Sequence, residues 1–175
     1  NFRLFRYCTG AGAPSSITGA RIMDNVTNAV QQTFTLAKDS TVTIAFGDEC
    51  YTPPGLCVEV HYYSGTLTVP NNANGYYVTW TLCCRNAPIV NHSGGSLTLT
   101  TQFPDPALAG GNNTPVFVQY PRDGYFCIGN EKNIDFSCTD PDGDSLSYEL
   151  ITPYQDRAIE VPNYLFPNEI NPVPY

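Results

Sequence analysis

The fold class is decided by the stretch Tyr76-Tyr77-Val78-Thr79-Trp80-Thr81-Leu82-Cys83-Cys84. Apolar and polar side chains alternate along most of it, so every second residue faces the same side of an extended strand. A strong turn signal, Asn71-Asn72-Ala73-Asn74-Gly75, precedes it. We therefore expect a core strand whose inward face carries Tyr76, Val78, Trp80, Leu82 and Cys84.

Similar short strands are expected on both sides of this stretch, and no helical period survives for more than two turns. Short strands between turns rich in Gly, Pro and Asn favour an all-β sandwich over a closed barrel. The expected strands are Phe2–Cys8, Ile17–Met23, Thr33–Leu36, Val42–Phe46, a hairpin over Leu56–Pro70, Ser96–Phe103, Val116–Gln119, Tyr125–Ile128, Ile134–Cys138 and Leu146–Leu150.

The Pro-, Gly- and Asn-rich segment 104–114 is the expected linker between two modules. Residues 1–103 form the first β-sandwich module and residues 115–175 a partial second one. About 60 residues with four strands make a thin core. We therefore expect the second module to continue beyond the chain, which reads as a fragment of something longer.

The composition suits a secreted β-protein that is built from polar but mostly uncharged residues. Hydrophobic residues make up 42% of the 175 residues and charged residues only 14%. The net charge of −8 argues against nucleic-acid binding, since nothing resembles a basic stripe. No apolar run is long enough to span a membrane as a helix.

Seven cysteines are too many for a reduced domain of this size, and they indicate disulfides formed in an oxidising compartment. The sequence lacks the two C-x₂-C pairs that are typical of a structural zinc site, so the cysteines favour disulfides over zinc. A local bridge between Cys50 and Cys57 is the first expected pairing, because a turn-forming segment separates them. The disulfide candidates are Cys8, Cys50, Cys57, Cys83, Cys84, Cys127 and Cys138.

The adjacent cysteines Cys83 and Cys84 point to opposite faces of a strand, so each needs its own partner. Cys8 on the first strand is the expected partner of one of them. Cys127 takes the other, or pairs with Cys138 across a hairpin. The odd number leaves one thiol free, paired outside the chain, or missing its partner.

An acidic turn, Asp140-Pro141-Asp142-Gly143-Asp144, precedes the alternating run Ser145–Leu150. Oxygen ligands at this spacing suit a hard cation, above all Ca²⁺. The run after it predicts a strand with Leu146, Tyr148 and Leu150 on one face. We expect a structural calcium site that stiffens the module, with ligands drawn from Asp140, Asp142, Asp144, Asp135 and Glu149.

Twelve tyrosines exceed what a core of this size requires, so some are expected on the surface, where they suit protein contact or sugar stacking. Short acceptor patterns for glycans also occur. Asparagine triplets begin at Asn25, Asn91 and Asn112. Asp39-Ser40-Thr41 and Asp144-Ser145-Leu146 resemble the O-glycosylation acceptors of Bacteroidota surface proteins, with Ser40 and Ser145 as the acceptors.

Several blocks of the chain together resemble large repetitive surface proteins of Bacteroidota, the gliding-motility-associated adhesins. The blocks are Arg6-Tyr7-Cys8-Thr9-Gly10 with Ala13–Ser16, Tyr63–Pro70, Trp80-Thr81-Leu82-Cys83-Cys84-Arg85-Asn86-Ala87-Pro88-Ile89, and Asp140–Tyr148. The resemblance implies a secreted cell-surface polypeptide of Ig-like or cadherin-like modules without catalytic activity. Its implied partners are other modules, copies of the same protein, or surface glycans and proteins.

Two hypotheses follow for function. The first is a structural or adhesive module that carries contact surfaces away from the cell, alone or in an extracellular filament. The second is a carbohydrate-binding module of a secreted multidomain enzyme, which would use exposed tyrosines and the acidic turn. Catalysis by this chain is not expected, because no base, nucleophile or pair of acids is recognisably placed.

Overall fold

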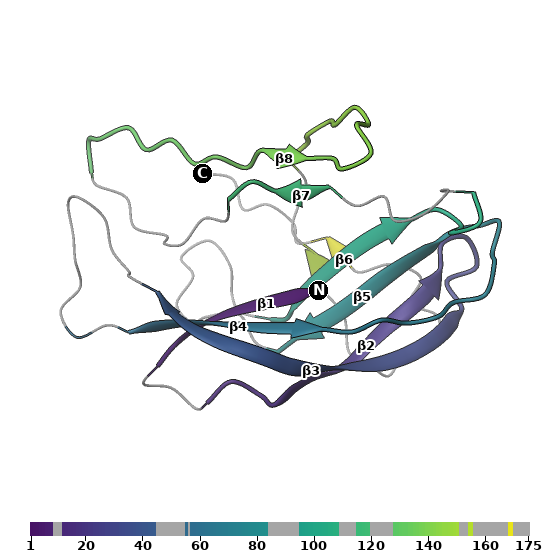
Figure 1. Cartoon of the computed structure of the whole chain (residues 1–175), viewed down its shortest axis with the longest axis horizontal. Coiled ribbons are helices and arrows are strands. Elements are labelled where there is room, and N and C mark those ends of the chain that lie inside the picture. Colours follow the sequence, from purple (N-terminus) through teal and green to yellow (C-terminus); the bar gives the residue numbers. More distant parts are fainter. Residues whose placement is uncertain are drawn as a thin grey trace. The chain divides into compact units, whose positions relative to one another are not determined.

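The computed structural model describes residues 1–8, 12–44, 55, 57–83, 95–108, 115–119, 128–150, 154–155 and 168–169 (Figure 1). These residues contain β-strands and no helix, and the strand pairings described below are all antiparallel. The predicted all-β, disulfide-linked class is confirmed. The architecture is compatible with an all-β, sandwich-like fold.

The chain forms two compact units, each assembled from three segments. The first unit takes residues Asn1–Ile17, Leu36–Leu67 and Asn113–Ser147, and the second takes Thr18–Thr35, Thr68–Asn112 and Tyr148–Tyr175. Each unit thus draws segments from both sides of the predicted linker at 104–114. This grouping differs from the predicted succession of 1–103, 104–114 and 115–175.

The first unit is built on strands β1 (Phe2–Tyr7), β4 (Val58–Ser64) and the second part of β3 (Val30–Ile44), in the order β1-β4-β3. Strand β3 passes through both units as one element of 15 residues. The sequence predicts two separate strands here because residues 37–41 carry few apolar side chains. Pairing with β4 holds this polar stretch extended, with a β-bulge between Lys38 and Ser40.

The second unit contains the first part of β3 with strands β2 (Ser16–Asp24), β5 (Tyr76–Leu82) and β6 (Leu97–Phe103). The short strands β9 (Tyr154–Gln155) and β10 (Asn168–Glu169) follow, in the order β3-β2-β5-β6-β9-β10. The predicted strands 17–23, 76–84 and 96–103 agree with β2, β5 and β6 to within two residues. Strand β5 pairs with β6 along its whole length, from Tyr76 opposite Phe103 to Leu82 opposite Leu97.

The buried core of the second unit gathers at one end of β5. Tyr76 is fully buried and Tyr77, on the opposite face, is 4% exposed, whereas Leu82 at the other end is 38% exposed. The predicted strand is present, but burial does not alternate along it. Its first two residues, Tyr76 and Tyr77, point to opposite faces of the sheet and are both buried. On β2 the buried residues Met23 and Ile22 lie opposite Tyr77 and Val78.

Of the strands predicted beyond residue 115, Tyr125–Ile128 lies outside the described residues apart from Ile128, and the others form only in small part. Strand β7 (Val116–Phe117) pairs with β8 (Cys138–Thr139), and these four residues are the only strand residues in 115–119 and 128–150. The predicted strand Leu146–Leu150 is wrong, since none of its residues joins a described ladder. Likewise, residues 65–70 form no returning strand of a hairpin. Strand β4 pairs with β1 and β3 instead.

Candidate functional site: an apolar groove in the first unit

A disulfide joins the residue after β1 to the residue before β4, two of the strands on which the candidate site is built. Cys8 bonds to Cys57, with 5.3 Å between their Cα atoms. The predicted bridge between Cys50 and Cys57 is therefore wrong. The physical reason is register: Tyr7 of β1 lies opposite Val58 of β4, so the next pair along the ladder brings the two cysteines face to face. The Cys8 amide also donates to the Cys57 carbonyl at 2.9 Å.

The expectation that Cys8 pairs with Cys83 or Cys84 is also wrong, because Cys8 is bonded to Cys57. Cys83 is also disulfide-bonded, as expected for a residue that needs its own partner. Cys138 is a half-buried thiol whose sulfur lies 3.8 Å from the Phe136 carbonyl oxygen. Cys50, Cys84 and Cys127 lie outside the described residues.

One face of the β1-β4-β3 ladder is rich in apolar side chains. Phe5 lies opposite Val60, and Val60 lies opposite Val42, so these three side chains cross the three strands on one face. Tyr62 is next along the same face, opposite Arg3. Phe5 is 38% exposed and Val42 47%, while Val60 is buried. The face thus has a covered centre and an exposed apolar margin.

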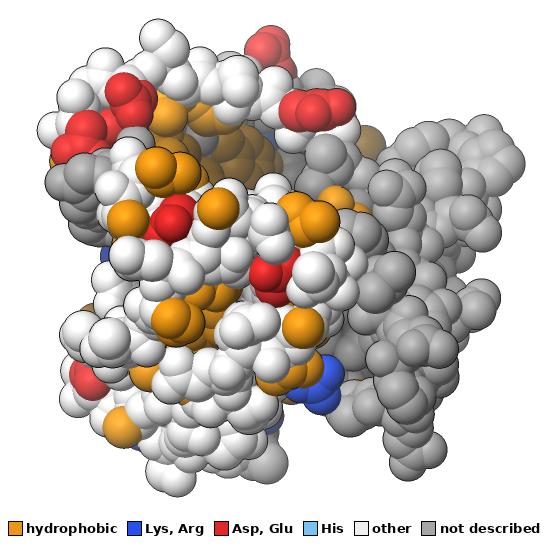
Figure 2. Space-filling model, turned by 90° about the vertical axis from the view of Figure 1, so that its right-hand side faces the viewer, with side chains coloured by type: hydrophobic (Ala, Val, Ile, Leu, Met, Phe, Trp, Pro, Cys, Tyr) orange, Lys and Arg blue, Asp and Glu red, His pale blue; other side chains and the backbone are white. Residues whose placement is uncertain are grey.

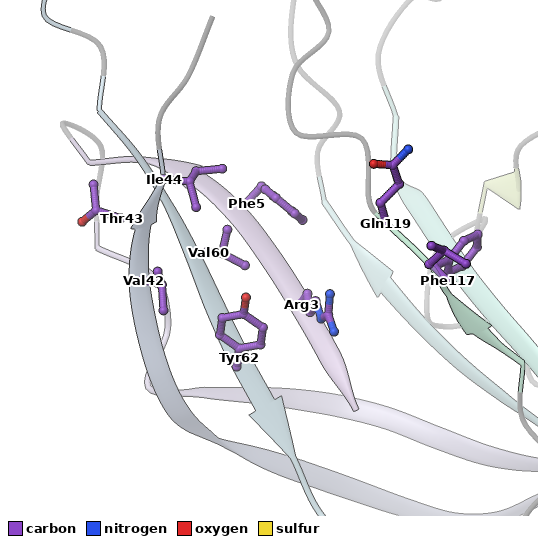
Figure 3. Close-up of a pocket in the computed structure, with 10 residues that line it drawn as sticks. Arg3, Phe5, Val42, Thr43, Ile44, Val60, Tyr62, Phe117 and Gln119 are labelled. Atoms are coloured by element: carbon purple, nitrogen blue, oxygen red, sulfur yellow. The ribbon is translucent and has the colours of Figure 1, made fainter. Parts of the chain in front are cut away.

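Strand β7 and the two residues after it add the remaining side chains of a groove on this face. The groove has a volume of about 550 Å³. Figure 3 shows Phe5, Val60 and Tyr62 on the strands of the ladder, and Phe117 and Gln119 on the segment opposite them. Phe117 is 41% exposed and Val118 59%. The lining residues are Arg3, Phe5, Val42, Thr43, Ile44, Val60, Tyr62, Phe117, Val118 and Gln119.

The groove lining carries a cation and no acidic side chain. The Arg3 guanidinium carbon lies 5.4 Å from the centre of the Tyr62 ring, within the range of a cation–π contact. Gln119 donates from Nε2 to Asp135 Oδ2 at 3.1 Å. The hydrogen bonds from the side chain and backbone of Ser137 to Asp135, with that of Gln119, hold the pKa of this carboxyl below its usual value. The Asp135 carboxylate beside the groove lining is therefore already hydrogen-bonded.

The opposite face of the same ladder carries both apolar and polar side chains, with Leu4 and Thr41 on either side of His61. Its Nδ1 lies 2.8 Å from Thr41 Oγ1, and its Nε2 lies 3.3 Å from Glu59 Oε2. One neutral tautomer satisfies both contacts, with Nε2–H donating to Glu59 and Nδ1 accepting from Thr41. Burial lowers the pKa of His61, Glu59 opposes this effect, and Lys38 and Arg6 add to it.

The five carboxylates predicted to bind calcium do not converge in the structure. Asp140 Oδ1 accepts from the backbone N–H of Asp142 at 2.9 Å and of Asp144 at 3.3 Å, which closes the turn as an Asx motif. Asp135 binds Ser137 and Gln119 instead, and Glu149 is exposed. Among the described residues, which include all five, no three His, Cys, Asp or Glu side chains form a metal-binding group.

The predicted glycan acceptors occupy different settings. Ser40 and Ser145 are exposed, the first on β3 beside the bulge and the second after the acidic turn. Asn25 is half-buried, and its backbone amide donates to the Gly75 carbonyl at 3.2 Å. Asn91 and Asn112 lie outside the described residues.

Asp24, a buried carboxylate in the second unit, is not predicted from the sequence. Asp24 ends β2 and is 5% exposed. Its Oδ1 accepts from the amides of Val26 at 2.9 Å and Thr27 at 2.6 Å. Asn72 donates to its Oδ2 at 2.7 Å, and Asn74 donates to both oxygens. These bonds, the Thr27 amide first, hold the pKa of Asp24 well below its usual range.

We call these hydrogen bonds to Asp24 the Asp24 cage. The cage connects the turn after β2 to the loop before β5. The only sequence signal for it was the Asn-rich turn 71–75, which gives no hint of the partner strand.

In the chain as described, no helix is long and apolar enough to cross a membrane. No protein-family model, no curated protein and no solved structure matches this chain.

Proposed function

We propose that this chain is a non-catalytic adhesive or structural module of a secreted cell-surface protein. The observation that carries the proposal is the groove in the first unit, which is lined by exposed apolar side chains and by the positively charged side chain of Arg3. The strands that form it are joined by a disulfide. Exposed apolar patches on a folded domain mark interaction sites. The Cys8–Cys57 bond supports an oxidising location outside the cytoplasm.

The surface chemistry supports contact without reaction. Figure 2 shows one face of the molecule on which apolar side chains form separate patches among polar ones, with several acidic groups between them. Together with the net charge of −8, this favours protein or surface partners over nucleic acid. The resemblance to gliding-motility-associated adhesins of Bacteroidota agrees with such a role and comes from the sequence blocks alone.

Adhesion by beads that carry the whole chain tests this function. Beads coated with the chain should attach to bacterial surface material or to protein-coated surfaces and resist detachment under flow. Val42→Asp, which places a charge in the exposed margin of the groove, should reduce the attached fraction several-fold. Leu108→Asp is the matched control, because Leu108 is 75% exposed and lies outside the groove. Equal loss in both variants, or no attachment to any surface, would contradict the proposal.

Carbohydrate binding is the second candidate function, favoured by exposed aromatic side chains. Tyr7 on the groove face of β1 is 50% exposed, and Tyr148 is 62% exposed. Exposed tyrosine rings stack on sugars. Binding of the chain to a glycan array, lost in Tyr7→Ala and kept in Leu108→Asp, would favour this function over protein contact.

A further inference from the structure

The segment of residues 145–150 has the pattern of a strand but forms none in the structure. Its apolar positions are Leu146, Tyr148 and Leu150, which share one face when the chain is extended. Leu146 is half-buried, Tyr148 is 62% exposed and Leu150 is fully exposed. We call residues 145–150 the exposed segment. Tyr148 and Leu150 expose apolar surface to solvent, at a free-energy cost that contact with another apolar surface would remove.

The groove face offers a row of matching length. Positions i, i+2 and i+4 of an extended chain span about 13 Å, from Leu146 to Leu150 in the segment and from Arg3 to Tyr7 on β1. Beside this row, Val42 and Phe117 expose 47% and 41% of their surface. An extended chain that lies in a groove and inserts alternate side chains is a common mode of peptide recognition.

Charge favours the same pairing. The stretch from Asp140 to Leu150 contains four acidic residues and no Lys or Arg. The groove lining contains Arg3 and no acidic residue. The Arg3 guanidinium carries five N–H donors, so it can donate hydrogen bonds to a carboxylate. An acidic segment is therefore attracted to this groove and would be repelled by most of a surface whose net charge is −8.

We infer that the exposed segment of one copy docks in the groove of a second copy. This inference rests on the proposed adhesive function and names its partner as the chain itself. The contact joins two different surfaces, so it is heterologous and leaves one segment and one groove open in every dimer. Repetition of the same contact builds head-to-tail chains, the arrangement expected of an extracellular filament.

Sedimentation velocity of the oxidised chain over a concentration series tests the contact. The wild-type chain should form species larger than dimers as the concentration rises. Leu150→Asp places a charge in the exposed segment, and Val42→Asp places a charge in the groove. Each variant should weaken association at least tenfold. Ile128→Asp is the matched control, because Ile128 is fully exposed, belongs to the same unit and does not line the groove. Circular dichroism would verify that each variant is folded.

A mixture of the two defective variants is the decisive measurement. The intact segment of Val42→Asp fits the intact groove of Leu150→Asp, so the mixture should form 1:1 dimers that grow no further. A monomeric wild-type chain, or a mixture that stays monomeric, would overturn the inference. Bead attachment to foreign surfaces that persists in a chain without self-association would leave the proposed function standing and remove only this partner.

Discussion

Asn74 donates its side-chain amide to both carboxylate oxygens of Asp24, at 3.2 Å from Oδ1 and 3.1 Å from Oδ2. The two residues are 50 positions apart in the chain. Their contact fixes the loop before β5 against the turn after β2, where Tyr76 is fully buried. A buried carboxylate is stable here because neutral N–H donors surround it.

Removal of the Asp24 charge should destabilise the second unit. In Asp24→Asn the new amide group cannot accept all five hydrogen bonds, and some buried donors lose their acceptor. We expect the Tm to fall by several degrees, as measured by thermal unfolding at pH 7. Asp39→Asn, at the exposed bulge of β3, is the control and should leave the Tm nearly unchanged. Equal Tm values for the two variants would show that the cage does not stabilise the unit.

The backbone at Gly75 admits no side chain. Its φ is +69°, and a Cβ there would lie 2.9 Å from the Phe103 carbonyl oxygen. Gly129 also has a positive φ, of +82°, but a Cβ there meets nothing within 4 Å. Gly129→Ala should cost about 1 kcal/mol of unfolding free energy from backbone strain alone. Gly75→Ala should cost clearly more in urea unfolding, and a smaller or equal loss would contradict the close approach.

The Cys8–Cys57 disulfide should stabilise the first unit through the long loop that it closes. The cysteines are 49 positions apart, and the chain-entropy relation gives about 4 kcal/mol for a loop of that length. The double variant Cys8→Ser/Cys57→Ser should therefore unfold at a much lower urea concentration. Peptide mapping of the unreduced protein should recover a peptide that joins Cys8 to Cys57. Recovery of a Cys50–Cys57 peptide instead would refute the observed pairing.

His61 should make the first unit less stable in mild acid. Its folded pKa is below the ordinary value of 6.5, so the unfolded chain binds a proton more readily than the folded one. The stability that the neutral imidazole contributes is complete above pH 6.5 and is lost as the pH falls through 6.5 towards the folded pKa. The free energy of unfolding, measured from pH 8 to pH 5, should decrease over this window. His61→Gln should flatten the profile, and an unchanged profile would assign the loss to other groups.

Calcium at the acidic turn stays a prediction from residue types. A bound ion would add to the hydrogen bonds that already close the turn on Asp140. The prediction is that a chelator lowers the Tm and that Asp142→Ala lowers it equally without chelator. Calorimetric titration of the chelated chain with Ca²⁺ would measure the binding directly. Identical melting curves with and without chelator would end the calcium hypothesis.

Local patterns in the sequence were enough to place several strands. In Phe2–Tyr7 the alternation is matched by burial, because half-buried and exposed side chains alternate along the strand. Ser16–Asp24 and Leu97–Phe103 form at the predicted places although their burial does not alternate. The same signal failed at Leu146–Leu150, where the alternation is clear but no described strand pairs with it. A strand needs a neighbour, and alternation alone does not supply one.

The sequence by itself determined the all-β class, the disulfide chemistry and most strand positions, because these depend on side-chain alternation and on cysteine content. Only the tertiary structure decided which residues meet. The register of β1 on β4 selected Cys8 as the partner of Cys57 and brought Phe5, Val60 and Val42 together as the groove face. Packing of a turn against a distant loop turned Asp24 into a buried, hydrogen-bonded anion. Such contacts between remote positions follow from strand pairing, which no short stretch of sequence encodes.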